Sequence, residues 1–382
     1  MSRGVFSLLR SGEGLIGAGM APVIGSFVDR HGGRWLVASG AVIATAGYLI
    51  LSQADAFWQF LIVRWSLVTV GDALMGSMVL NVVIARWFVR MRGRAIAFSS
   101  MGIGFGKVSM PLFAASLLVW LGWRHTWAVF GLVTFCLLVG PAIYYLRKSP
   151  EDMGLEPDGA LPATPTPETA RSVRRPVPST EDAVWTRKEA IRTRAFWLIV
   201  VVFGVSSIGV TGLNLHVFPY VSDLGYSDLV AAVVMSVIAF TQLTSPLVWG
   251  FIAERMDVRR TTMTKFLIQA AGLTLAITSS DLNLLYVGFF LYGIGLGGNM
   301  VLPDVMWARF FGRVSLGKIR GLGYLLTHVM AATGPPFFGF LFDYLGNYTL
   351  SFTLFAVSLV LSGFLSLLIV APDKQPDQVT SG

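Results

Sequence analysis

The chain has 382 residues, of which 54% are hydrophobic and 13% are charged, and its formal net charge is +8. A soluble domain carries about 25% charged residues, so this composition excludes a soluble enzyme and indicates a protein with many membrane-spanning helices. The single cysteine, Cys136, excludes a disulfide framework and a thiolate metal cluster. With four histidines and no clustered carboxylates, we expect no cofactor, no metal site and no enzymatic activity.

About 20 apolar residues span a bilayer as a helix, and eleven stretches of the sequence have this character. They lie at residues 8–28, 35–52, 57–82, 95–120, 126–146, 195–220, 228–252, 263–280, 283–306, 321–342 and 349–371. We therefore predict an all-α, polytopic membrane protein with five spans in its first part and six in its second.

Residues 147–194 differ in composition from the apolar stretches, because seven prolines are spread between Ser149 and Ser179. Such a stretch is typical of a linker. Ser179 and Asp182 have the spacing of a capping box, so we expect a short interfacial helix after them, with Trp185 at the level of the lipid headgroups. The chain then divides into an N-terminal bundle (1–146), a cytoplasmic linker (147–194), a C-terminal bundle (195–372) and a cytoplasmic tail (373–382).

Most lysines and arginines lie in the linker and in the loops at 29–34, 86–94, 253–265 and 308–320, whereas the alternate loops carry acids. The positive-inside rule predicts that these basic loops and the C-terminus face the cytoplasm, in a plasma membrane or a bacterial inner membrane, and that Met1 lies outside. The positive charge is thus a topology signal and does not indicate nucleic-acid binding.

The sequence also repeats itself in the same direction. "GSMVLN" (76–81) matches "GNMVLP" (298–303), and "GSFVDRHGGR" (25–34) matches "GFIAERMDVR" (250–259). Repeats of this size predict two pseudo-symmetric helix bundles joined by the linker.

The first copy of the second repeat resembles the signature loop of the major facilitator superfamily. Its matching residues are Gly25, Asp29, Arg30, Gly32, Gly33 and Arg34, and Gly250, Glu254, Arg255 and Arg259 form a degenerate second copy. "RWFVRMRGRA", "GWRHTWAVFG" and "SPEDMGLEPDG" are similar to the monocarboxylate-porter and oxalate–formate antiporter branch. The resemblance implies a monomeric secondary active transporter that moves a small organic anion such as a monocarboxylate by alternating access, with a proton as a candidate co-substrate.

In the family the signature loop follows the second helix, whereas here it follows the first apolar stretch, so the resemblance implies that the family's first helix is missing, either because Met1 is a misassigned start or because the truncation is real. We therefore keep the alternative of a truncated, non-transporting paralogue or a membrane sensor. The resemblance also implies that Asp29 faces the N-terminus of a helix that starts around Ile319–Gly321, and that Glu254 faces the helix that starts near Gly93. Such contacts would hold the cytoplasmic face closed like a latch. Arg30 and Arg34 would form ion pairs with acids or lipid phosphates.

Ionisable side chains within spans mark transport pathways or structural pairs. From their positions along neighbouring helices we expect Asp72 and Lys107 to meet near the membrane midplane, either as a proton and anion site or as a static pair. Arg64 either attracts an anion or caps the structure, and we expect Glu13 to extend toward the headgroups. His216, Asn299 and His328 are further candidates for the substrate path.

Two expectations concern the C-terminal half. We expect Asp304, near the cytoplasmic end of its helix, to be structural. Carboxylate-transporting relatives have a basic residue in the spans that correspond to 228–252 or 321–342, and neither stretch contains one here. On this basis an anionic substrate would depend on Arg64 and Lys107 of the other half.

Overall fold

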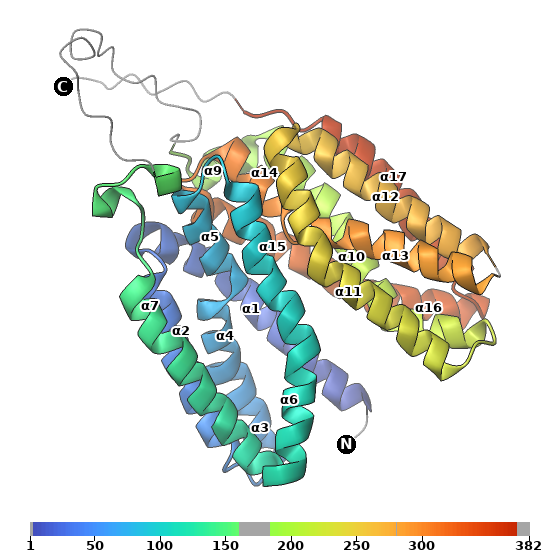
Figure 1. Cartoon of the computed structure of the whole chain (residues 1–382), viewed down its shortest axis with the longest axis horizontal. Coiled ribbons are helices and arrows are strands. Elements are labelled where there is room, and N and C mark those ends of the chain that lie inside the picture. Colours follow the sequence, from blue (N-terminus) through green and yellow to red (C-terminus); the bar gives the residue numbers. More distant parts are fainter. Residues whose placement is uncertain (1–2, 160–183, 280, 373–382) are drawn as a thin grey trace.

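The structure, a computed structural model, describes residues 3–159, 184–279 and 281–372. Every regular element of this part of the chain is helical (Figure 1). The N-terminal bundle contains α1 (Arg3–His31), α2 (Arg34–Leu51), α3 (Phe57–Val63), α4 (Thr69–Met75), α5 (Ser77–Trp87), α6 (Arg92–Thr134) and α7 (Gly140–Tyr145). The C-terminal bundle contains α10 (Arg194–Asp223), α11 (Asp228–Arg255), α12 (Val258–Thr278), α13 (Leu282–Gly298), α14 (Leu302–Phe311), α15 (Leu316–Ala332), α16 (Gly334–Leu345) and α17 (Thr349–Leu367).

Eight helical stretches in the described residues are long and apolar enough to cross a membrane. One of them, Arg92–Tyr145, contains two spans because the chain turns back at Gly122, where φ is 74° (Figure 1). The helices α1 and α12, with 29 and 21 residues, are also long enough for a span. The arrangement is compatible with the eleven predicted spans.

Two spans are broken at the sites of the first sequence repeat. A non-helical residue, Gly76, separates α4 from α5, with ψ at 171°. A turn at 299–301 separates α13 from α14. The two copies of the repeat therefore have the same structural effect, which supports the pseudo-symmetry of the bundles. Discontinuous helices of this kind expose backbone polar groups near the middle of membrane transporters.

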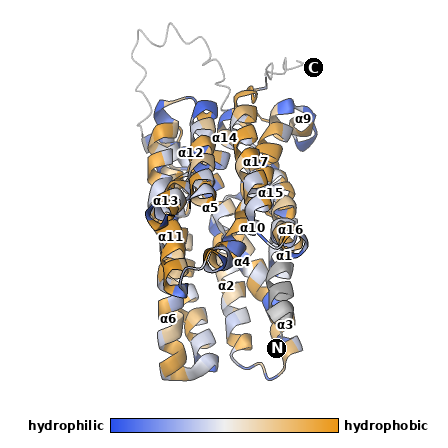
Figure 2. Ribbon diagram, turned by 90° about the vertical axis from the view of Figure 1, so that its right-hand side faces the viewer, coloured by the Kyte–Doolittle hydropathy of each residue, from blue (hydrophilic) through white to orange (hydrophobic). Residues whose placement is uncertain are grey.

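The two bundles contact each other at one end, which we call the basic end because it carries the loops around residues 29–34, 86–94, 253–260 and 309–318. Figure 2 shows hydrophilic residues gathered at this end and apolar residues along the helices. The described C-terminal residues also lie there, whereas α1 begins at the opposite end (Figure 1). From the basic end the ribbons of the two bundles diverge (Figure 1).

Glycines allow the backbones of the two bundles to approach closely at the basic end. A Cβ atom on Gly25 of α1 would lie 1.9 Å from the carbonyl oxygen of Gly317 at the start of α15. In the symmetry-related place, a Cβ atom on Gly250 of α11 would lie 2.6 Å from the carbonyl oxygen of Gly93 in α6. Only glycine allows the backbones to approach so closely.

The linker helix α9 (Arg187–Arg192) begins after Thr186, whose hydroxyl accepts a hydrogen bond from the Glu189 amide. The capping box expected at Ser179 and Asp182 lies outside the described residues. The expectation for Trp185 was wrong: its side chain is 5% exposed and packs edge-on against Phe311, with ring centroids 5.5 Å apart. The residue is therefore part of the protein core at the basic end.

Candidate functional site

A cavity of about 190 Å³ lies between the two bundles, next to both helix breaks. Its polar lining consists of hydroxyl and amide groups from Ser77, Asn81, Ser100, Ser207, Asn299 and Thr327. Its rings come from Phe203, Trp307, Tyr324 and His328. Asp304 and Arg320 complete the wall and are its charged residues. The cavity thus combines fixed charge, hydrogen-bonding groups and apolar surface, as small-molecule sites do.

Asp304 and Arg320 form a buried, two-pronged ion pair. Asp304 lies in the first turn of α14 and Arg320 in α15. The Arg320 guanidinium donates from Nε to one carboxylate oxygen of Asp304 and from Nη2 to the other, the latter over 2.8 Å. Their side chains are 7% and 8% exposed. Such parallel hydrogen bonds are the strong form of this contact, and they offset part of the cost of burying both charges.

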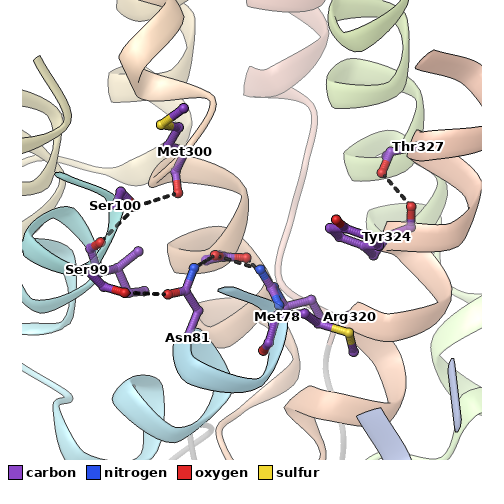
Figure 3. A network of polar contacts seen from close by, with 10 residues as sticks. Met78, Asn81, Ser99, Ser100, Met300, Arg320, Tyr324 and Thr327 are labelled. Carbon is purple, nitrogen blue, oxygen red and sulfur yellow. Dashed lines mark hydrogen bonds and ion pairs between the residues drawn. The ribbon is translucent and has the colours of Figure 1, made fainter. Parts of the chain in front are cut away.

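The N-terminal bundle holds this pair from the other side. Asn81 of α5 donates from Nδ2 to Asp304 Oδ2 over 2.5 Å, and Arg320 donates from Nη1 to the Met78 carbonyl over 3.0 Å (Figure 3). Ser99 of α6 donates to the Asn81 side-chain oxygen over 3.4 Å (Figure 3). The ion pair is therefore shared between the bundles.

The expectation that the span after residue 320 lacks a basic residue was wrong. Hydropathy placed the start of that span at Gly321, but α15 begins at Leu316 and includes Lys318 and Arg320. A charge at a span end lowers the local hydropathy, so hydropathy alone assigns Arg320 to a loop. The objection to an anionic substrate in this half of the molecule therefore does not hold. Asp304, which we expected to be structural, lies in the cavity wall.

Of the other three candidates in the C-terminal half, two line the cavity and one does not. Asn299 and His328 line the cavity. The His328 ring stacks on Tyr324 with a centroid separation of 3.7 Å. By contrast, His216 does not line it: its Nδ1 lies 3.1 Å from the Tyr348 hydroxyl, between α10 and the start of α17. Its contacts are those of a packed histidine.

In the N-terminal half, Arg64 binds Glu13 of α1, with Nε 2.5 Å from Oε1. Glu13 therefore does not extend toward the headgroups, and its side chain is 12% exposed. Asp72, partly buried on α4, lies close enough to Arg64 to interact with it electrostatically. Lys107 lies in α6, but its side chain is outside the described part of the chain. The pairing of Asp72 with Lys107 stays a prediction.

The signature loop makes the contact that its resemblance implies. Asp29 accepts hydrogen bonds from the amides of Gly317 and Lys318, over 2.9 and 2.8 Å, at the positive N-terminus of α15. Its carboxylate also pairs with Arg86 at 2.8 Å. Arg30 is exposed. The guanidinium of Arg34 lies over the ring of Trp35, at 5.2 Å.

The second copy of the loop makes the mirrored contact. Glu254 accepts a hydrogen bond of 2.8 Å from the Arg94 amide in the first turn of α6, and pairs with the Arg94 side chain at 2.7 Å. Arg259 instead binds Asp257, and its hydrogen bonds lower the pKa of that carboxyl to about 2. Arg255 lies over the Phe251 ring at 6.0 Å. The acid of each copy thus meets the start of a helix in the opposite bundle.

The linker adds a third contact across the basic end. Arg187 of α9 donates to the Pro22 carbonyl and, over 2.7 Å, to the Ser26 hydroxyl, both in α1. It also donates to the Lys318 carbonyl of α15 over 3.1 Å. This role could not be predicted from the sequence, because Arg187 is one of several basic residues in the linker.

Two related helix bundles, closed against each other at one end and sharing a charged cavity at their helix breaks, have the architecture of a secondary transporter. The family model of the Major Facilitator Superfamily matches residues 1–247 and 217–382. The chain belongs to this superfamily.

Among its relatives, mouse monocarboxylate transporter 6 is 25% identical over 367 residues, which is 91% of this chain and 75% of the relative. The oxalate:formate antiporter of Oxalobacter formigenes is 24% identical over 285 residues, which is 73% of this chain and 63% of that protein. The crystal structure of the human organic anion transporter MFSD10 superposes with a TM-score of 0.71 at 16% identity, covering 94% of this chain and 83% of the other. The two sequence relatives agree with the branch inferred from the sequence motifs, and the superposition agrees with the fold.

Proposed function

We propose that this protein is a secondary active transporter of the cell membrane that carries a small organic anion, with monocarboxylates as the first candidates. The observation that carries the proposal is the buried Arg320 guanidinium in the wall of a cavity between the bundles. Asp304 accepts from Nε and Nη2 of this guanidinium and the Met78 carbonyl accepts from Nη1, so the remaining N–H groups of Nη1 and Nη2, with the neighbouring hydroxyls and amides, can bind a carboxylate. The relatives named as monocarboxylate and organic anion transporters support the same substrate class.

The volume of the cavity limits the size of the solute. At about 190 Å³ it is smaller than the roughly 300–1,000 Å³ of sites for drug-sized ligands. The rings of Phe203 and Trp307 give one side of the cavity an apolar surface, which suits a short carbon chain. A solute with one carboxylate and a few further heavy atoms satisfies both conditions.

The proposal is tested by uptake into proteoliposomes that contain the purified full-length chain. Labelled L-lactate, pyruvate, formate and oxalate are the probes, and labelled glucose is the neutral control. We expect saturable uptake of at least one acid and none of glucose. A folded protein that binds these acids without carrying them would instead support the sensor alternative, and a folded protein that does neither would overturn the proposal.

We further propose that the described state is closed to the cytoplasm and that Asp29, Glu254 and their partner amides form the latch. Three of the contacts that join the bundles at the basic end involve Asp29 with α15, Glu254 with α6, and Arg187 with both α1 and α15. All three must break before the cavity can open on that side. The latch is therefore made of a few hydrogen bonds, which thermal motion can open during a transport cycle.

Asp29→Asn should reduce uptake by about tenfold or more while leaving folded protein in the membrane. Each hydrogen bond to a charged group contributes about 1.5–3 kcal/mol, and the substitution removes the charge that meets Gly317, Lys318 and Arg86. Uptake rates at equal expression measure the effect. Asp55→Asn is the matched control, because this acid pairs with Arg124 at an exposed site. Equal uptake by wild type and Asp29→Asn would contradict the latch.

A further inference from the structure

A second polar cleft lies at the basic end, apart from the cavity at the helix breaks. It has a volume of about 210 Å³ and lies where the ends of α1 and α5 meet the start of the linker and the turn between α14 and α15. Its polar lining consists of Asp29, Arg86, Lys148, Ser149, Glu151 and Arg313. The cleft is present while Asp29 still binds α15, so a small molecule can enter it without breaking the latch.

The cleft has an excess of positive charge. Its lining contains three basic and two acidic side chains, and Lys148 forms no ion pair with the residues that the structure describes. Beyond the lining, Asp152 acts electrostatically on Arg86 and Lys318 acts on Asp29, and these two opposite charges balance each other. The excess of one positive charge favours an anion as the ligand.

Two guanidinium groups face the same space and lack hydrogen-bond acceptors. The Arg86 side chain is 7% exposed and pairs with Asp29 through Nη2, whereas its Nε is buried and has no partner among the described residues. Arg313 pairs with Glu151 at 2.7 Å and lies close enough to Arg86 for the two charges to repel each other. A buried donor without an acceptor is costly, and an anion between the two arginines would offset both effects.

The cations of the cleft come from both bundles. Arg86 ends α5, and Lys148 follows α7, so both belong to the N-terminal half, whereas Arg313 precedes α15 in the C-terminal half. A ligand that contacts Arg86 and Arg313 together can bind only while the bundles meet at the basic end. Such a ligand must favour the closed state, because it binds that state more tightly than the open one.

We infer that this cleft binds a phosphate group and that the bound group holds the basic end closed. The oxygens of a phosphate point in several directions, so they can accept hydrogen bonds from two guanidinium groups and one ammonium group at the same time. A planar carboxylate matches a single guanidinium, and Asp29 and Glu151 already fill that role. A free phosphate compound and a lipid headgroup share this chemistry, and the experiment below separates them.

Binding of inorganic phosphate to the full chain in dodecyl maltoside is the first test. Equilibrium dialysis should show one phosphate fewer per chain for Arg313→Gln than for the wild type. Arg259→Gln is the matched control, because this arginine pairs with Asp257 at an exposed site. Glu151→Gln removes the carboxylate that competes for Arg313, so its half-saturating concentration should fall by about fivefold, the value of one exposed ion pair. Equal binding curves for all four proteins would overturn the inference.

The accessibility of Ala21 provides the second test, since it reports separation of α1 from α15. This residue is 2% exposed, and its carbonyl oxygen lies 2.4 Å from the place of a Cβ atom on Gly321. In an Ala21→Cys, Cys136→Ser background, phosphate at ten times its half-saturating concentration should slow modification by a water-soluble maleimide about tenfold. Potassium chloride at the same ionic strength should not. Arg313→Gln should react at one rate with and without phosphate.

The same labelling in mixed micelles separates the two sources, with phosphatidic acid as the probe and phosphatidylcholine as the control. Slower labelling with inorganic phosphate assigns the site to a free phosphate compound, and slower labelling with phosphatidic acid alone assigns it to a lipid headgroup. An unchanged rate with both would overturn the inference. If Arg313→Gln does not fold, the opposite shift expected for Glu151→Gln decides. Neither measurement needs a transported solute, so their failure leaves the proposed function standing, and failed uptake leaves this site standing.

Discussion

Replacing Arg320 by Gln should lower carboxylate uptake by about 100-fold or more and reduce the free energy of unfolding by about 3–5 kcal/mol. The loss of stability follows because Asp304 would keep its charge at a site that is 8% exposed, without the guanidinium that balances it. The loss of uptake follows because the glutamine amide carries no positive charge to attract the anion and has fewer N–H groups to bind it. Thermal unfolding in detergent and initial uptake rates measure the two effects.

The double change Asp304→Asn with Arg320→Met separates the two roles of the pair. It removes both charges at once, so no unbalanced charge stays buried, and most of the stability should return. Uptake should stay absent, because the anion has lost its anchor. A stable double variant that transports at the wild-type rate would show that the pair only supports the fold. Arg259→Gln is a control for the loss of an arginine, since this residue pairs with Asp257 at an exposed site.

Gly317→Val should shift the protein out of the state that is closed at the basic end. A Cβ atom at Gly317 would lie 2.3 Å from the Gly25 carbonyl oxygen and 2.8 Å from a carboxylate oxygen of Asp29, so the side chain must push α1 away from α15. Overpacking of this kind costs about 1–3 kcal/mol, which corresponds to a roughly five- to 150-fold change in the equilibrium between closed and open forms. Uptake should fall by a similar factor.

The change of state can be measured by labelling a cysteine at Ala21, which is 2% exposed and lies against the start of α15. In a Cys136→Ser background, a water-soluble maleimide should modify this position faster in Gly317→Val than in the parent. Gly19→Ala is the matched control, because nothing lies within 4 Å of a Cβ atom there. Equal labelling rates in all three proteins would show that the glycine contact does not hold the end closed.

Much of the fold follows from the sequence because each of its signals is local. Apolar runs of membrane length give the spans, and the repeats at 76–81 and 298–303 place the two helix breaks in matching positions. The contact of Asp29 with α15 could also be expected from the signature motif, since a carboxylate at the negative end of its own helix needs a positive partner. The glycines Gly25 and Gly250 belong to the same motif, although their spacing alone does not show which backbone each one meets.

The site was harder to predict because hydropathy classifies charged residues by their neighbours along the chain. Arg320 and Lys265 adjoin basic loops and were counted with them, yet both side chains are buried. Charged residues inside the membrane also bind partners that are far away in the sequence. Asp304 binds Asn81 of the other bundle, and Glu13 binds Arg64 of another helix. A search for lysines and arginines within two turns of a span end would have found both buried residues as candidates.

The ion pair of Asp304 and Arg320 also bears on how an empty carrier behaves. Asn81 and the Met78 carbonyl bind the pair from the N-terminal bundle, so separation of the bundles at the basic end leaves both charges short of hydrogen bonds. A bound carboxylate can take over one of these contacts, whereas an empty cavity offers only water. For the anion transport that we propose, reorientation without cargo should then be slower than reorientation with cargo, so exchange of one anion for another should be faster than net uptake.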